Sequence, residues 1–282
     1  MSGAAERVTA IITYYRNAEF FGEALASVLA QTRPADEILV VDDASPAADA
    51  LDAATLPAEV RLIRMPVNSG PGAARQRASS EARGELLAYL DADDLWAPTK
   101  LERQVAAMRA APECPASHTG TVMFHDDGRE RSFLVKPARL SGAESALGGH
   151  ALPSCLMVRA SALAAVGGWS LDRSIIEDWD LELRLTSEVG PYCFVAEPLM
   201  RFRRFAHGNL SSQHARNIRR LISTIHHHRR RIDGFHGHGA WRGVMRREIR
   251  EHGEAMGGVT GRLVALGAML GGLGSPRLPQ RA

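Results

Sequence analysis

Short apolar runs alternate with helix-patterned segments through the first 110 residues, and this alternation constrains the fold more than any other feature of the chain. We predict strands for four apolar runs: Val8–Thr13, Glu37–Val41, Val60–Met65 and Glu85–Leu90. We predict helices for the segments 20–30, 47–54, 71–81 and 99–110. Strands that alternate with helices at this spacing indicate an α/β fold, with a mainly parallel, doubly wound (Rossmann-like) sheet flanked by helices.

The pattern loosens after Pro112, where the apolar runs are shorter and less regularly spaced. Hydrophobic periodicity still separates strands from helices there. The later elements that we predict are strands within 118–135 and at 152–158 and 195–205, and helices at 161–166, at 177–189 and over most of 213–256.

Two of the predicted strands end in acidic clusters. Asp42 and Asp43 follow the second strand, and Asp91, Asp93 and Asp94 follow the fourth. The carboxyl ends of parallel strands lie at one edge of a sheet, and open α/β folds bind their ligands at that edge. We therefore expect both clusters at the same edge, around a ligand site.

Three carboxylates within four residues repel one another. Two like charges about 4 Å apart repel by about 4 kcal/mol at an effective dielectric constant of about 20. A hard divalent cation such as Mg²⁺ would offset this repulsion through one or two of the carboxylates; a solvated acidic turn is the alternative. The Asp42-Asp43 pair could likewise cap a helix, or accept hydrogen bonds from a nucleotide base or ribose.

Several classes of protein are not supported. The first strand runs into Thr13-Tyr-Tyr-Arg-Asn-Ala instead of GxGxxG, and no GxxxxGK[ST] occurs, which argues against a dinucleotide oxidoreductase and a P-loop NTPase. Three scattered cysteines without a CxxC argue against a disulfide framework or a zinc site. The apolar stretch near the start is too short to predict a signal peptide. No run of about 18 uncharged apolar residues occurs, so we expect no membrane-spanning helix.

Charge is distributed unevenly along the chain. Residues 1–200 contain 18 Lys and Arg against 28 Asp and Glu, whereas residues 201–250 contain 13 Arg against two acidic residues. The basic region is either a solvated helical face or a surface for anionic lipid headgroups or a phosphate-bearing lipid acceptor. Nucleic acid is not an expected partner because the acidic body would repel it. His226–His228 are consecutive and do not share one helix face, so they would make a poor metal site.

Several motifs occur in order between residues 7 and 212. They are Thr13-Tyr-Tyr, Ser27-Val-Leu-Ala-Gln31-Thr, Glu37-Ile-Leu-Val-Val-Asp-Asp-Ala-Ser45, Asn68-Ser-Gly-Pro-Gly-Ala-Ala-Arg75, Gly84-Glu-Leu-Leu-Ala-Tyr-Leu-Asp-Ala-Asp-Asp-Leu-Trp96-Ala-Pro-Thr-Lys100-Leu, Val166-Gly-Gly-Trp169, Glu177-Asp-Trp-Asp180 and Arg203–Ser211. Together they resemble the motifs of family 2 glycosyltransferases of GT-A fold. Two positions depart from the family pattern. Thr13-Tyr-Tyr-Arg16 stands where Pro-Thr-Tyr-Asn is common, and Gln76 follows Arg75 where Asn is usual.

The resemblance implies transfer of a sugar from a nucleotide-sugar donor to an acceptor hydroxyl, with inversion at the anomeric carbon. It places Thr13, Tyr15 and Asp43 around the nucleoside, with Asp43 facing a base N–H, and it makes Arg75 a contact to the nucleotide or its pyrophosphate. Asp91 and Asp93 form the DxD motif of the family, with Asp93 the first choice as ligand of a Mg²⁺ or Mn²⁺ cofactor and Asp94 a possible ligand.

The same resemblance makes Asp178 the catalytic base, with Glu177 supporting it or contacting the acceptor. Taken alone, this pair reads as acids favoured by the dipole at the start of a helix. In some relatives a histidine at the position of His207 joins the metal or the pyrophosphate; a surface histidine is the alternative.

The resemblance also gives an organisation and a setting. We expect a nucleotide-sugar-binding half (1–111), an acceptor-binding half (112–212) and a basic helical C-terminal region (213–282). A UDP-sugar donor and a glycan or lipid-linked saccharide acceptor are favoured, in bacterial surface polysaccharide synthesis on the cytoplasmic side of the membrane. A non-catalytic nucleotide- or glycan-binding module and a sugar-phosphate nucleotidyltransferase stay open as alternatives, although the chain lacks the Gly-rich loop that the latter needs.

Overall fold

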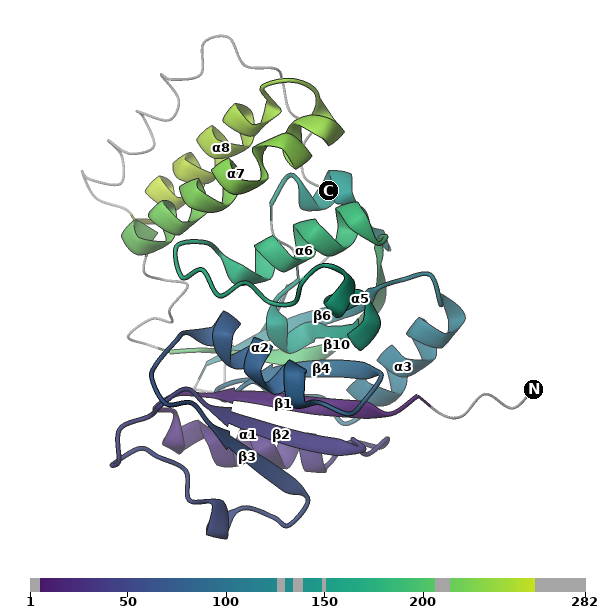
Figure 1. Ribbon diagram of the computed structural model, residues 1–282, viewed down its shortest axis with the longest axis vertical. Coiled ribbons are helices and arrows are strands. Elements are labelled where there is room, and N and C mark those ends of the chain that lie inside the picture. Colours follow the sequence, from purple (N-terminus) through teal and green to yellow (C-terminus); the bar gives the residue numbers. More distant parts are fainter. Residues whose placement is uncertain (1–5, 126–129, 134–138, 149–150, 206–213, 257–282) are drawn as a thin grey trace.

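The computed structural model describes residues 6–125, 130–133, 139–148, 151–205 and 214–256. Its first half contains four neighbouring parallel strands (Figure 1). In their order across the sheet these strands are β3 (Val60–Arg64), β2 (Glu37–Asp42), β1 (Val8–Tyr14) and β4 (Leu86–Asp91). The predicted parallel α/β arrangement is confirmed for this half.

The second half of the chain extends the same sheet with mixed pairing. Its strands are β5 (Leu95–Trp96), β6 (Ala116–His125), β7 (Glu130–Phe133), β8 (Arg139–Leu140), β9 (Leu156–Arg159) and β10 (Tyr192–Arg204). The order across the sheet is β3-β2-β1-β4-β9-β6-β10-β5, with β7 beside β6 and β8 beside β10. β9 is antiparallel to both β4 and β6, whereas β6 and β10 are parallel.

Helices cover both faces of the sheet. Successive side chains of a strand point to opposite faces, and in β1 Ile11 packs into one core while Ala10 and Ile12 pack into the other. The first of these cores also contains α2 (Pro71–Glu81), α5 (Ala160–Ala165) and α6 (Glu177–Glu188). The second contains α1 (Ala18–Leu29) and α3 (Lys100–Ala110). Burial on both faces explains why the strands are continuous apolar runs.

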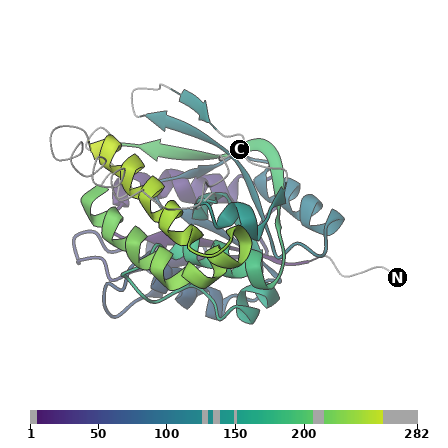
Figure 2. The ribbon, with the colours of Figure 1, turned by 90° about the horizontal axis from the view of Figure 1, so that it is seen from above.

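A third core joins the C-terminal helices to the α/β body. α7 (His214–His236) and α8 (Ala240–Met256) form a helical hairpin that stacks on α6, on the far side from β3 (Figures 1 and 2). Trp179 and Leu183 of α6 pack here against Leu221 and Ile225 of α7 and Val244 of α8. The short helix α4 (Gly142–Ser145) adjoins the same cluster. Within the described ranges, no helix is long and apolar enough to span a bilayer.

The prediction of a helix at 47–54 is wrong. Residues 47–49 form a turn, and only Ala53–Thr55 form a short 3₁₀ helix. The Asp52 carboxylate accepts a hydrogen bond from Ala54 N (2.9 Å), and Pro57 follows two residues after the helix ends. Residues 52–55 are exposed, so no buried face stabilises a longer helix, and isolated short helices are marginal in water.

We predict that Gly84→Ala destabilises the protein by about 1–3 kcal/mol, the usual cost of overpacking. Gly84 is buried, and a Cβ there would lie 2.6 Å from Thr9 N and 2.9 Å from Arg7 O, which are backbone atoms that cannot move aside. Urea denaturation measures the change. The control is Gly22→Ala in α1, where a Cβ meets nothing within 4 Å, so Ala should stabilise by about 0.5–1 kcal/mol. Equal stabilities of the two variants would contradict this packing.

Candidate active site

The two acidic clusters lie at the same edge of the sheet, as the sequence predicts. In the register of the parallel strands, Tyr14 pairs with Asp42, and Thr13 pairs with Asp91. The end of β1 is therefore flanked on one side by the carboxylates that follow β2 and on the other by those that follow β4.

Asp43 is buried and is held by the loop that precedes α2. Its Oδ1 accepts a hydrogen bond from Ser69 N (2.7 Å), and its Oδ2 accepts from Gly70 N (2.7 Å) and Asn68 Nδ2 (3.0 Å). Burial raises the pKa of Asp43, and the two backbone amides partly offset that effect. A carboxylate has about four acceptor positions, so this one can still accept a hydrogen bond from a ligand N–H.

The loops that follow β1 and β2 are joined and strained. Arg16 (φ 60°) and Ala44 (φ 57°) adopt the left-handed conformation, which costs an L-residue about 1–2 kcal/mol. Arg16 N donates a hydrogen bond to Ser45 Oγ (3.1 Å), which links the two loops. Tyr15 is 38% exposed, so it offers an aromatic surface at the acidic edge.

Asp91 is held by two of the residues that the sequence assigns to the nucleotide. Its Oδ1 accepts hydrogen bonds from Thr13 Oγ1 (2.6 Å) and from Arg75 Nη2 (2.7 Å). The Asp91 side chain is still 32% exposed. Thr13 and Arg75 therefore orient the Asp91 carboxylate in this structure.

Asp93 and Asp94 have different environments although they are adjacent. Asp94 is buried, and its carboxylate accepts hydrogen bonds from Ser154 Oγ (2.6 Å) and Arg203 N (3.1 Å). Asp93 is partly exposed; burial and the charge of Asp91 raise its pKa to about 6. Arg203 Nε donates to the Asp93 carbonyl oxygen (3.0 Å). Asp94 and Arg203 hold the turn, and Asp93 is the carboxylate that the turn presents.

A buried arginine connects this edge to the start of α6. Arg75 is 2% exposed, its guanidinium lies 5.0 Å from the centre of the Trp169 ring, and its Nη1 donates to Glu177 Oε1 (3.1 Å). The other oxygen of Glu177 accepts from Arg220 Nη2 of α7 (2.5 Å). Burial by itself would lower the pKa of Arg75, but the carboxylates of Asp91 and Glu177 raise it, so the guanidinium stays charged.

Asp178 is the available carboxylate of the Glu177-Asp178 pair. It is partly exposed, and its Oδ1 accepts a hydrogen bond from Trp179 N (2.8 Å). Burial and the neighbouring charge of Glu177 raise the pKa of Asp178 to about 6. Glu177 is committed to two guanidinium groups, which leaves Asp178 able to take up a proton near neutral pH.

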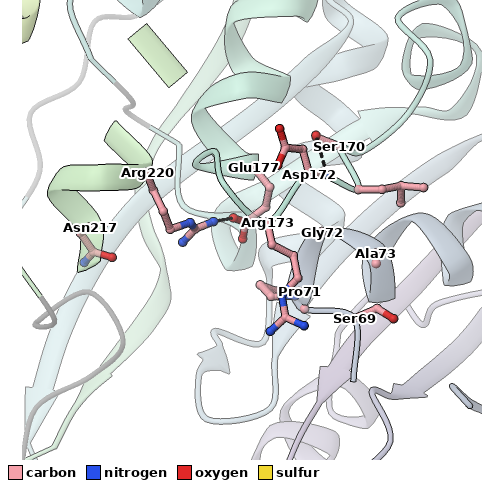
Figure 3. A pocket seen from close by; sticks show the side chains of 12 residues that line it. Ser69, Pro71, Gly72, Ala73, Ser170, Asp172, Arg173, Glu177, Asn217 and Arg220 are labelled. Atoms are coloured by element: carbon pink, nitrogen blue, oxygen red, sulfur yellow. Dashed lines mark hydrogen bonds and ion pairs between the residues drawn. The ribbon is translucent and has the colours of Figure 1, made fainter. Parts of the chain in front are cut away.

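A pocket opens between α2, α6 and α7 (Figure 3). Arg220 points at Glu177 in this view. The Arg173 side chain lies close to Gly70, where an added Cβ would be 3.5 Å from Arg173 Nε. Arg173 Nη1 donates to Asn68 O (2.9 Å), the residue that also holds Asp43. The residues that line the pocket are Ser69, Gly70, Pro71, Gly72, Ala73, Ser170, Leu171, Asp172, Arg173, Glu177, Asn217 and Arg220.

The carboxylates of Asp91 and Asp93 fit a hard divalent cation. Asp91 and Asp93 are both partly exposed, and carboxylate oxygens are the ligands that Mg²⁺ and Mn²⁺ prefer. A cation there would also relieve the repulsion that raises the pKa of Asp93. His207, the third predicted ligand, lies outside the described residues.

A different group of metal-ligand residue types lies between α6 and α7. The ligand atoms of Asp180, His227 and His228 gather within 4.8 Å. His228 Nε2 is already bonded to Asp180 Oδ1 (2.8 Å), while Asp180 Oδ2 accepts two hydrogen bonds from Arg184. Because an arginine charge already neutralises this aspartate, the group serves better as a contact between helices than as a cation site.

Sequence reasoning missed the roles of Ser154 and Gln76. No local pattern marks Ser154, which reaches Asp94 from a 3₁₀ turn ahead of β9. Gln76 Oε1 accepts from Trp169 N (2.8 Å), and a Cβ on Gly168 would lie 2.1 Å from the same oxygen. Gln76 therefore packs against the glycine turn at Gly168 and bonds to the residue that follows it. Trp169 itself packs in the first core and is 2% exposed.

Solved structures share this fold. TarS 1–349 of S. aureus, in complex with UDP-GlcNAc, superposes with a TM-score of 0.62 at 14% identity, covering 93% of this chain and 89% of that one. The mannosyltransferase PcManGT from Pyrobaculum calidifontis, in complex with GDP-Man and Mn²⁺, gives a TM-score of 0.63 at 21% identity, covering 95% and 81%. The expected GT-A fold is confirmed.

Sequence comparisons give the family. The succinoglycan biosynthesis protein ExoO of Rhizobium meliloti (strain 1021) is 41% identical over 105 residues, which cover 37% of this chain and 30% of ExoO. The chain spans between 30% and 54% of the length of the first three curated relatives that it matches. The family model described as Glycosyl transferase family 2 matches residues 9–167, more than half of the chain. With the GT-A fold and the ordered motifs already described, this match means that the chain belongs to glycosyl transferase family 2.

Proposed function

We propose that this protein is an inverting, metal-dependent glycosyltransferase that moves a sugar from a nucleotide-sugar, by preference a UDP-sugar, to a hydroxyl group of a glycan or lipid-linked saccharide. The observation that carries this proposal is the arrangement of two partly exposed carboxylates, Asp93 and Asp178, connected through Asp91, Arg75 and Glu177. Family membership supports the reaction class, and the name of ExoO supports a role in surface polysaccharide synthesis.

On the donor side, Tyr15 would stack on the base and Asp43 would accept a hydrogen bond from a base N–H. Thr13 and Arg75 orient the Asp91 carboxylate. A Mg²⁺ or Mn²⁺ ion held by Asp91 and Asp93 would stabilise the negative charge that develops on the leaving nucleoside diphosphate.

On the acceptor side, Asp178 takes the proton of the attacking hydroxyl group. The acceptor oxygen forms a bond to the anomeric carbon while the bond to the nucleoside diphosphate breaks on the opposite face, which inverts the configuration. A carboxylate with a pKa of about 6 is mostly ionised at neutral pH and is a stronger base than an ordinary aspartate. Glu177, fixed by Arg75 and Arg220, holds the start of the helix that carries this base.

We also propose the organisation that the sequence indicates, with residues 1–111 binding the nucleotide-sugar, residues 112–212 the acceptor, and residues 213–282 forming a basic helical region. Cytoplasmic synthesis at the inner face of the membrane fits this assignment. His207 is proposed as a further contact to the metal or the pyrophosphate.

The donor site can be tested by calorimetric titration of UDP, dTDP and GDP, each with and without Mn²⁺. We expect one nucleotide to bind in a Mn²⁺-dependent manner, and Asp93→Ala to weaken that binding by about tenfold or more, or about 1.4 kcal/mol. The control is Glu59→Ala, an exposed carboxylate just before β3 and so at the opposite edge of the sheet, which should bind normally. Failure of all three nucleotides to bind would overturn the donor site.

The base can be tested with Asp178→Asn, using the donor that titration identifies and following its hydrolysis or transfer. We expect kcat to fall by about 10²–10⁴, the usual contribution of general base catalysis, with donor affinity unchanged. Because the base must be ionised and its pKa is about 6, the wild-type rate should fall as the pH drops through about 6. Glu188→Gln, at the other end of α6, should keep full activity. Nucleotide binding without turnover of any donor would support the non-catalytic alternative.

We propose that the outer face of α7 contacts anionic lipid headgroups. Arg219, Arg229 and Arg230 are exposed on this helix, and each basic residue near an anionic surface contributes about 1 kcal/mol. In sedimentation with phosphatidylglycerol-rich vesicles, the wild type should bind at low salt, and a variant with these three arginines changed to Gln should not. A variant in which three exposed arginines of α2 and α3 (Arg77, Arg103 and Arg109) are changed to Gln is the matched control. The proposal would be contradicted if the wild type bound pure phosphatidylcholine vesicles equally well, or bound neither kind of vesicle. This face would then be a solvated helix surface.

A further inference from the structure

Three polar side chains of α7 face the start of α6. Arg220, Thr224 and His228 are four residues apart, so they lie on one face of the helix. Each contacts a different part of the first turn of α6 or of the residues just before it. We call this set the α7 seam.

The first contact of the α7 seam is an ion pair reinforced by two hydrogen bonds. Arg220 donates from Nε (3.0 Å) and Nη2 (2.5 Å) to the carbonyl oxygen of Ile175, and from Nη2 to Glu177 Oε2 (2.5 Å). The side chain of Glu177 is 12% exposed and that of Arg220 is 23% exposed, so the pair is largely shielded from water. Bonds of this kind to ionised groups are about twice as strong as neutral ones.

The other two contacts cap and anchor the same helix. The N-cap residue Ile176 has no side chain that can cap α6, and its backbone N donates to Thr224 Oγ1 (2.8 Å). One turn further on, the fully buried His228 bonds to Asp180 (2.8 Å). The free N–H groups of a helix start need acceptors, and here the acceptor comes from the C-terminal hairpin.

We propose that Arg220 is a positioning residue of the active site and that the C-terminal hairpin completes that site by fixing Glu177 and the start of α6, which carries Asp178. This inference rests on the proposed role of Asp178 as base and deepens it. It makes α7 part of the catalytic machinery, beyond the stability that the third core supplies.

The charges around Asp178 make the proposal specific. Glu177 on α6 disfavours its ionised form, whereas Arg75 on α2 and Arg220 on α7 favour it. Arg75 divides its charge between Asp91 and Glu177. Arg220 bonds to the carboxylate of Glu177 and not to that of Asp91, so its charge acts mainly on Glu177. Removal of the Arg220 charge therefore leaves Glu177 less compensated and makes Asp178 harder to ionise.

The test compares the pH dependence of kcat in Arg220→Gln, Arg220→Lys and the wild type. Gln keeps a hydrogen-bond donor for the Ile175 carbonyl but removes the charge. The acidic limb of the profile, where kcat falls as the pH drops, should therefore move to higher pH by about half a unit or more, with the affinity for the nucleotide-sugar unchanged. Lys keeps the charge, so Arg220→Lys should have a limb close to that of the wild type. Arg230→Gln removes an exposed arginine charge elsewhere on α7 and should leave the limb in place.

The reciprocal variant tests the same interaction with the opposite sign. Glu177→Gln removes the charge that Arg220 balances, so the limb should move to lower pH, and the double variant with Arg220→Gln should lie near the wild type. This cycle isolates the coupling between the two residues. Glu177→Gln by itself still tests the proposal if Arg220→Gln does not fold. Limbs that stay unchanged in both single variants would overturn it.

A readout without turnover separates this inference from the proposed function. The ¹³C resonance of the Asp178 carboxyl group, assigned with Asp178→Asn, titrates with the same midpoint that the kinetics should report. Shifted midpoints in an inactive protein would overturn the transferase assignment and retain the electrostatic role of Arg220. Turnover with identical midpoints in all variants would support the transferase assignment and overturn the role of Arg220.

Discussion

The buried guanidinium of Arg75 is the interaction on which the rest of the site depends. It bonds to Asp91 at the end of β4 and to Glu177 at the start of α6, and it lies over the ring of Trp169. Carboxylates brought this close together repel, and a buried charge without a partner is strongly destabilising. One charged group that is shared by both halves of the site allows acidic residues from two distant segments to lie beside each other.

This arrangement divides the acids into pairs with separate roles. In each pair one carboxylate is fixed by hydrogen bonds: Asp94 by Ser154 and Arg203, and Glu177 by Arg75 and Arg220. The other member, Asp93 or Asp178, is partly exposed and has a pKa raised to about 6. Environments that separate neighbouring titratable groups are how active sites assign different tasks to chemically identical residues.

The C-terminal hairpin is both a basic segment and a part of the packed body. By composition, 201–250 is a basic segment that contrasts with an acidic body. In the structure, α7 packs its apolar face into the third core and directs Arg220 and Thr224 at the start of α6. Arg219, Arg229 and Arg230 of the same helix are exposed. A single helix thus joins the body through one face and carries basic side chains on exposed positions.

The sequence by itself determined the parallel strands, both acidic clusters and their common edge, because hydrophobic periodicity is local and strand ends need no long-range information. It failed at 47–54, where no buried face supports a helix. Only the tertiary structure decided which carboxylates are fixed and which are available. Arg75 and Glu177 are 102 positions apart, and Ser154 and Asp94 are 60 apart. Such pairings follow from how the helices pack on the sheet, and no local pattern encodes them.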